Sequence, residues 1–157
     1  MLAQGDKSSR PSPPAEATGK IGAATVKISY SSPAVKGRPV LNGLIPYGKA
    51  WRAGANEATI LETDKDVKVE GKPLPAGKYS LFVIAGEKEW NIILNSETGQ
   101  WGIKRSGEAN YDPAKNVVSV NVKPGKAAKM NERLNYEVTD KGFVLRWENV
   151  EVPVSVK

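Results

Sequence analysis

The sequence contains no cysteine and no histidine in its 157 residues. The absence of cysteine excludes disulfide bonds, thiolate metal sites and a cysteine nucleophile. The absence of histidine removes the usual general base, the commonest zinc ligand and every catalytic arrangement that pairs histidine with serine or cysteine. Most familiar enzyme chemistry is thereby excluded, and we expect a non-enzymatic protein without a cofactor or a metal.

Long apolar runs and clusters of basic residues are also missing. No stretch of the sequence approaches the ~20 apolar residues of a membrane-spanning helix. The formal net charge is +6, and residues 1–52 carry the whole excess, with eight basic and two acidic residues. Because these basic residues are spread singly and no aromatic–basic motif accompanies them, we expect no nucleic-acid partner. A weak preference for an acidic surface is the milder interpretation.

The first 22 residues differ in composition from the rest of the chain. Met1 to Gln4 are similar to the last residues of a bacterial secretory signal, although an ordinary initiator segment would look the same. With the lack of cysteine, this start leads us to expect a secreted or periplasmic cell-envelope protein. Residues 5–22 are rich in proline, serine and glycine, which predicts an extended tail that does not order by itself. The predicted division is therefore a tail, residues 1–22, and a folded domain, residues 23–157.

From residue 24 onward, apolar and polar residues alternate with a period of two, which is typical of half-buried strands. The first example places Val26, Ile28 and Tyr30 on one face. The segment from Lys78 to Ile84 ends instead in a continuous apolar run, which predicts a central strand covered on both faces. The other expected strands are residues 57–61, 67–69, 90–94, 116–122, 132–139 and 143–147, and a last strand with Val150, Val152, Val154 and Val156 on one face.

About ten short strands separated by turns predict an all-β, single-domain antiparallel β-sandwich of jelly-roll-like arrangement. The helix signal is weak, because only residues 126–132 could form a turn or two. Pro153 indicates that the last strand lies at an edge of its sheet or begins there. An edge strand and an extended tail together suggest self-association, in which the tail of one subunit lies on the next and gives an oligomer or a filament.

Several longer runs identify a family resemblance. They are Arg10 to Pro13, Tyr30 to Pro33, Pro46 to Gly48, Trp51 to Thr59, Leu74 to Phe82, Trp90 to Ile93, Trp101-Gly102 and Leu145 to Glu148. On these runs the sequence resembles the bacterial domain-of-unknown-function family 2911, a group of secreted or envelope proteins, from about residue 10 to the C-terminus. The resemblance implies a β-rich domain outside the cytoplasm and implies no activity.

The most concentrated cluster of polar and aromatic side chains gives the candidate binding residues Tyr47, Trp51, Arg52, Asn56 and Glu57. Tryptophan can stack on a sugar, arginine donates a planar fork of hydrogen bonds, and asparagine both donates and accepts. These residues could form a carbohydrate pocket. The alternative is a structural crossover in which a half-buried Arg52 pairs with Glu57, since buried charges are normally paired.

Acidic residues offer two weaker possibilities. A glycosidase needs two carboxylates about 5–9.5 Å apart, for which Glu57 with Glu148 is the natural choice. Asp64, Asp66 and Glu70 superficially resemble calcium ligands, but the glycine of a calcium loop is out of place and a charged turn fits better. The sequence therefore predicts a non-catalytic β-sandwich with a structural or self-associating role. A carbohydrate- or small-ligand-binding module is the alternative, and a carboxylate-based hydrolase is the third possibility.

Overall fold

The computed structural model describes residues 12–41, 44–45, 47–54, 59–98 and 113–157. Over these residues the chain forms mainly antiparallel strands and one 3₁₀ turn, Pro113–Lys115, without an α-helix, which confirms the all-β prediction. Among them, therefore, no helix is long and apolar enough to span a membrane. The strands are β1 (Pro14–Ile21), β2 (Ala24–Ser31), β3 (Ala50–Trp51), β4 (Thr59–Thr63), β5 (Val67–Val69), β6 (Lys72–Leu74), β7 (Gly77–Ile84), β8 (Trp90–Asn95), β9 (Asn116–Val122), β10 (Gly125–Thr139) and β11 (Gly142–Ser155).

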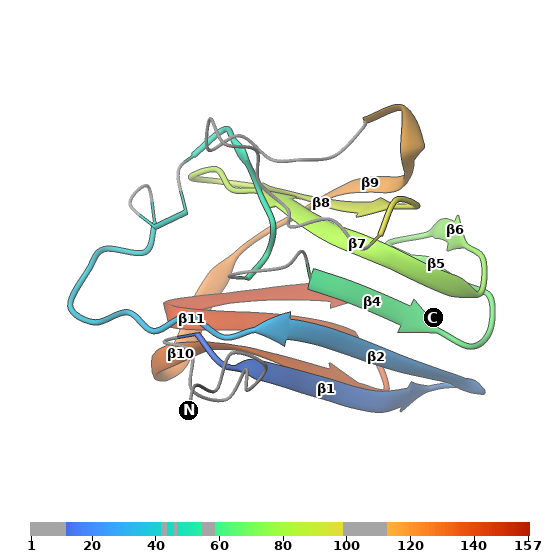
Figure 1. The fold of residues 1–157 in the computed structure, drawn as a ribbon, viewed down its shortest axis with the longest axis horizontal. Helices are drawn as coiled ribbons and strands as arrows, with labels where there is room; N and C mark the ends of the chain where they lie inside the picture. The colour runs from blue at the N-terminus through green and yellow to red at the C-terminus, as the bar shows by residue number, and fades with distance from the viewer. Residues whose placement is uncertain (1–11, 42–43, 46, 55–58, 99–112) are drawn as a thin grey trace, which may run out of the picture.

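The larger sheet contains seven strands. Its order is β1-β2-β4-β7-β8-β9, the short β3 also pairs with β7, and every pair is antiparallel. Figure 1 shows this sheet curving over β10 and β11. Leu81, Phe82 and Val83 of β7 are all buried, with exposed fractions of 1%, 0% and 0%. This burial confirms the prediction of a central strand covered on both faces.

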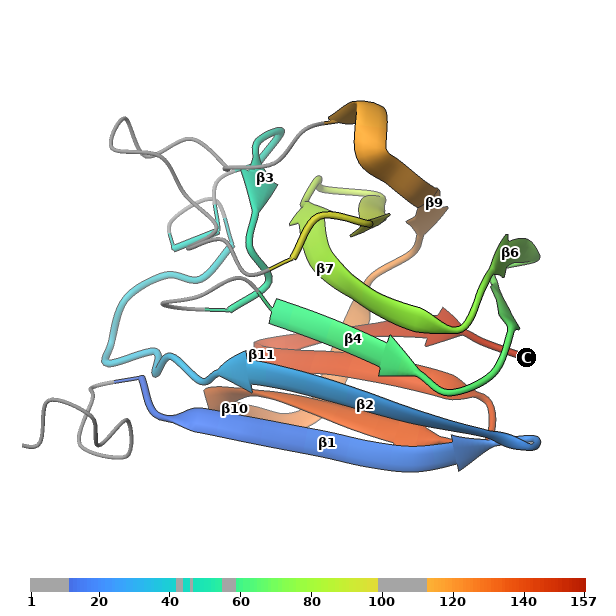
Figure 2. The same cartoon turned by 45° about the vertical axis from the view of Figure 1, so that its right-hand side comes forward.

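The second layer consists of β10 and β11, and β11 folds back on itself. The Val156 backbone N–H donates to the Lys141 carbonyl at 3.0 Å. A straight strand of the 14 residues of β11 would separate its ends by about 45 Å, so the strand must reverse direction. The reversal occurs near Glu148, whose φ of 54° is left-handed. Figure 2 shows the two arms of β11 side by side.

The end of β11 is not a free edge. Lys68 and Lys157 exchange two backbone hydrogen bonds, of 2.8 and 2.9 Å, and so attach β5 to the end of β11. The expectation that the C-terminal strand lies at an edge is therefore wrong for its last residues. Pro153 is tolerated because it precedes the residues that pair with β5, so its missing N–H falls outside that ladder.

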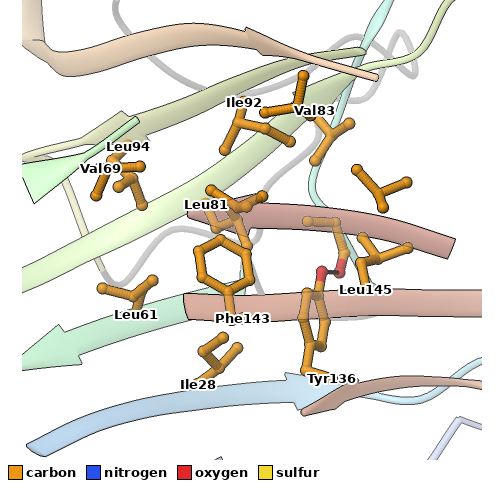
Figure 3. Packing of buried hydrophobic residues seen from close by; sticks show 14 of the residues in the cluster. Ile28, Leu61, Val69, Leu81, Val83, Ile92, Leu94, Tyr136, Phe143 and Leu145 are labelled. Atoms are coloured by element: carbon orange, nitrogen blue, oxygen red, sulfur yellow. Dashed lines mark hydrogen bonds between the residues drawn. The ribbon is translucent and has the colours of Figure 1, made fainter. Parts of the chain in front are cut away.

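Apolar side chains fill the space between the two layers. Figure 3 shows Ile28 and Leu81 of the larger sheet facing Tyr136 and Phe143 of the second layer. All four are buried, with exposed fractions between 0% and 6%. Because burying one large apolar side chain stabilises the fold by ~1.5–3 kcal/mol, this interface is the main source of folding free energy.

Residues 14–21 differ from the sequence expectation, because they form β1 and pair with β2 over all eight positions. The inward face of β1 carries three small residues, Ala15, Ala17 and Gly19, and ends at the buried Ile21. A Cβ atom on Gly19 would lie 2.8 Å from the Val138 carbonyl oxygen of β10, so the two strands are in close contact. Small side chains give a weak hydrophobic signal, and for this reason the strand was predicted as part of the tail.

Two further expectations concern residues 126–132 and the start of the predicted tail. Residues 126–132, where a helical turn was considered, lie within β10. Residues 1–11 of the predicted tail lie outside the described residues, so the structure does not test their role.

Candidate functional site

β3 and β4 occupy consecutive positions along the same side of β7. Trp51, at the end of β3, lies opposite Val83, and Thr59, at the start of β4, lies opposite Leu81. One residue separates the two partners on β7, whereas seven residues, 52–58, separate Trp51 from Thr59. We call residues 52–58 the excursion loop, since they interrupt a strand in the interior of the sheet.

The base of the excursion loop is attached to both layers of the sandwich. The Thr59 N–H donates to the Arg52 carbonyl at 3.4 Å, and the Thr59 Oγ1 hydroxyl donates to the Ala53 carbonyl at 3.0 Å. The Tyr136 hydroxyl of β10 donates to the same Ala53 carbonyl at 2.6 Å. Burial raises the pKa of Tyr136 well above its usual value, so this hydroxyl remains a donor at physiological pH.

The backbone at the base is strained. Ala53 is fully buried and has a φ of 59°, a left-handed conformation that costs a residue with a Cβ atom about 1–3 kcal/mol. Gly54 follows in a confined position, where a Cβ atom would lie 2.8 Å from Thr59 Oγ1. Such strain persists only where surrounding contacts determine the conformation, as Tyr136 and Thr59 do here.

Stacking positions the aromatic part of the candidate site. The rings of Trp51 and Trp147 lie 5.9 Å apart with an interplanar angle of 11°. Trp147 is buried and donates its Nε1–H to the Glu132 carbonyl at 3.3 Å, whereas Trp51 is only half-buried. Tyr47 is likewise half-buried and packs against the same apolar core. Trp51 is thus an aromatic side chain backed by a fixed second ring.

The structure describes three of the five candidate residues. Arg52 is half-buried at the start of the excursion loop, as the structural alternative expected. Asn56 and Glu57 lie outside the described residues. The pairing of Arg52 with Glu57 therefore stays a prediction, and so does the carboxylate pair of Glu57 with Glu148.

Sequence analysis placed Tyr30 on a buried face but assigned no role to the hydroxyls of Tyr30 and Tyr136, of which Tyr136 supports the loop. Tyr30 of β2 and Tyr136 meet edge to face, with ring centres 4.7 Å apart, and the Tyr136 backbone N–H donates to the Tyr30 hydroxyl at 3.3 Å. Burial raises the pKa of Tyr30 as well. Both tyrosines alternate along their strands in step with the buried aliphatic residues, so the sequence predicts that they are buried. Because a buried tyrosine hydroxyl needs a hydrogen-bond partner, this position also indicates that each hydroxyl is hydrogen-bonded.

The acidic residues once considered as calcium ligands hold turns instead. Each accepts a backbone N–H from another segment at 2.6–2.9 Å: Asp64 from Thr25, Asp66 from Ala76 and Glu70 from Ser155. Within the described part of the chain, no three acidic side chains come together in a group that could hold a metal ion. These contacts support the charged-turn interpretation.

Comparison with known proteins gives one match. A family model described as "Protein of unknown function (DUF2911)" matches residues 12–156. The matched region includes all the strands, β1 among them, and the excursion loop. No curated protein and no solved structure matches the chain.

Proposed function

The chain belongs to the DUF2911 family, and since that family has no known function, we propose one from the geometry: a non-catalytic carbohydrate-binding module. The recognition element in this proposal is the excursion loop together with Tyr47 and Trp51. A location outside the cytoplasm is part of the proposal, and the absence of cysteine is compatible with it.

The interruption of an interior strand is the observation that carries this proposal. A continuous strand beside β7 would keep the ladder of hydrogen bonds and would not need the left-handed Ala53. At the base of the excursion loop both are given up, and the Tyr136 hydroxyl holds Ala53 in its left-handed conformation. Irregularities that interrupt a sheet and store strain often accompany binding or catalytic sites, which supports a functional role for this one.

The chemistry of the residues supports a neutral, polar ligand with a flat apolar face, as a sugar has. Trp51 offers an aromatic ring for stacking, and its contact with Trp147 limits the entropy lost on binding. Arg52 and Asn56 supply hydrogen-bond donors, and Asn56 also supplies an acceptor. The lack of histidine and cysteine favours binding over catalysis.

The test is a glycan array probed with the full-length protein, followed by calorimetric titration with a glycan that the array retains. We expect Asn56→Ala to weaken binding at least about tenfold, which corresponds to about 1.4 kcal/mol. Asn149→Ala, an exposed side chain on the second layer, is the matched control and should bind as the wild type does. Both variants should melt at the wild-type temperature. An array without retained glycans, or an Asn56→Ala variant with full affinity, would contradict the proposal.

Self-association remains a second proposal, and its route needs revision. Residues 14–21 pair with β2 of their own chain and the Pro13 carbonyl accepts the Ser32 N–H at 2.8 Å, so at most residues 1–11 are left to reach a neighbouring subunit. The larger sheet offers a different surface for association.

A further inference from the structure

β9 forms an edge of the larger sheet. It pairs with β8 on one side, and among the described residues no strand pairs with its other side. Figures 1 and 2 show β9 at the border of the sheet away from β1. Val117 of β9 is 40% exposed, and within the described chain it is one of two large apolar side chains exposed to this degree. The unpaired N–H and C=O groups of such an edge can accept another strand.

The composition of β9 lacks the features that normally protect an edge. Its seven residues, Asn116–Val122, include four valines and no charged residue, proline or glycine. Natural edge strands are usually guarded by lysine, by proline or by cover from another element. Uncharged segments of six or seven residues with high β-propensity are those that pair most readily with a copy of themselves. The nearest charged residues, Lys115 and Lys123, flank the strand at its two ends.

Side-chain hydrogen bonds hold β9 firmly against β8. Asn91 Nδ2 donates to Asn121 Oδ1 at 3.0 Å, and Ser119 Oγ donates to Asn91 Oδ1 at 3.2 Å. Asn95 Nδ2 donates to Asn116 Oδ1 at 2.8 Å. These bonds fix the polar side chains on the outer face of β9, so the backbone edge is already ordered before a partner arrives. Such preorganisation lowers the entropy lost on association.

The sequence of β9 matches itself in the antiparallel direction. We propose that β9 pairs with β9 of a second copy about a two-fold axis at Ser119, so that the sheet continues through a dimer. In this register Val118 lies opposite Val120 of the other copy, and both side chains belong to the buried face of their own sheet. Ser119 lies opposite Ser119 on the outer face. A shift by one residue would place each buried face opposite an exposed one, and a shift by two residues would leave only five of the seven residues paired, so this register pairs the strand most completely.

The interface has two further properties. One strand pair buries little area compared with a stable dimer, so the association is weak and is measured between about 10 and 500 µM. In the proposed register Lys115 of one copy lies opposite Lys123 of the other at both ends of the strand. Glu97 lies 3.6 Å from Lys115 and offsets part of this repulsion, so added salt should change the strength of the dimer only slightly. This inference goes beyond the proposed carbohydrate binding and does not depend on it.

Disulfide cross-linking of single cysteine variants tests the register directly, because the chain has no cysteine of its own. Directly opposed residues of antiparallel strands lie ~4.5–5.5 Å apart at Cα, within the reach of a disulfide. With oxidised glutathione as the oxidant, Ser119→Cys should give a disulfide-linked dimer as its main product. Thr18→Cys, an exposed position on the opposite edge strand β1, is the matched control and should remain monomeric. Equal cross-linking of the two variants would overturn the proposal.

Analytical ultracentrifugation of the cysteine-free chain gives the independent measurement. We expect a monomer–dimer equilibrium that depends on protein concentration and only slightly on salt. Val117→Lys should weaken it at least about fivefold through added charge on the edge, whereas Thr18→Lys should leave it unchanged. A monomer at every concentration, or assemblies larger than a dimer that Val117→Lys does not affect, would overturn β9 pairing. The second result would favour association through the N-terminal residues.

Discussion

The two edge strands of the larger sheet, β1 and β9, differ in how they are protected. β1 lies against β10, and small residues on its inward face, Gly19 above all, allow this close contact. Its outward face carries Glu16 and Lys20. β9 carries four valines without a charge, and among the described residues no strand pairs with its far side. Contact with β10 thus protects the β1 edge, whereas the apolar β9 edge, which has no second pairing strand in the described part of the chain, is suited to a partner.

Aromatic side chains pack behind β1, the edge strand that β10 covers. Tyr30 pairs with Ala15 of β1 across the sheet and meets the ring of Tyr136 of β10. Tyr136 in turn supports Ala53 at the base of the excursion loop. β1 and the candidate site are therefore both supported by Tyr136, whereas β9 lies at the opposite end of the larger sheet.

The largest loss of stability should come from a bulky side chain placed between β1 and β10, which are in close contact. Gly19→Val adds a side chain whose Cβ atom alone would lie 2.8 Å from the Val138 carbonyl oxygen. Overpacking of this kind should lower the free energy of unfolding by about 3 kcal/mol, measured by urea denaturation. Thr18→Val, on the exposed face of the same strand, is the control and should change it by less than about 0.5 kcal/mol. Equal stability of the two variants would mean that β10 does not cover β1 closely.

Alkaline pH should weaken the covered edge next. Burial raises the pKa of Tyr30 and Tyr136 in the folded state, whereas tyrosines of the unfolded chain titrate near pH ~10. Their contribution to stability is therefore fully present below about pH 10 and is lost as the pH rises toward the folded-state pKa values. Urea denaturation between about pH 8 and 11.5 should show this decline.

Tyr136→Phe is the variant that isolates this pH effect. It should make the alkaline decline shallower, and at neutral pH it should lower the free energy of unfolding by about 1 kcal/mol, because the hydrogen bond to Ala53 is lost. If the free energy of unfolding of this variant fell with pH as steeply as that of the wild type, the alkaline effect would belong to other groups. One such group is Tyr79, whose pKa is also raised by burial.

A smaller effect is expected where β9 joins β8. Asn91→Ala removes the side-chain hydrogen bonds to Asn121 and Ser119 and should lower the free energy of unfolding by about 1 kcal/mol. It should also weaken dimerisation, since β9 would be held less firmly. Asn149→Ala is a control for both measurements. If Asn91→Ala dimerises as the wild type does, these hydrogen bonds do not prepare the edge.

The smallest effect should come from the charges beside β1. Lys27 lies 3.9 Å from Glu16 and 3.8 Å from Glu62, and all three side chains are substantially exposed. Lys27→Ala should change the free energy of unfolding by no more than about 0.5 kcal/mol, as is usual for surface ion pairs. It should leave the oligomeric state unchanged if β10 alone is sufficient to protect this edge. Thermal melting and sedimentation check the two expectations.

Most strands and their buried faces could be predicted from the amino-acid sequence alone. Alternation with a period of two is a property of each pleated segment, so it could be recognised without knowing what lies opposite. Val26, Ile28 and Tyr30 of β2 are buried as this pattern predicts, and the continuous apolar run of β7 correctly indicated cover on both faces. In the candidate site, sequence analysis selected Trp51 and Arg52, and both are half-buried beside the excursion loop.

Which strands lie together, and where they are interrupted, depends on contacts that form only in the folded chain. The small residues of β1 become a strand face because β10, more than 100 residues later in the chain, covers them. The left-handed Ala53 is held by Tyr136, and the reversal of β11 near Glu148 turns its last residues toward β5. These features depend on contacts between distant segments. Local hydrophobic patterning does not encode such contacts, because a pairing partner adds its free energy only after the chain has folded.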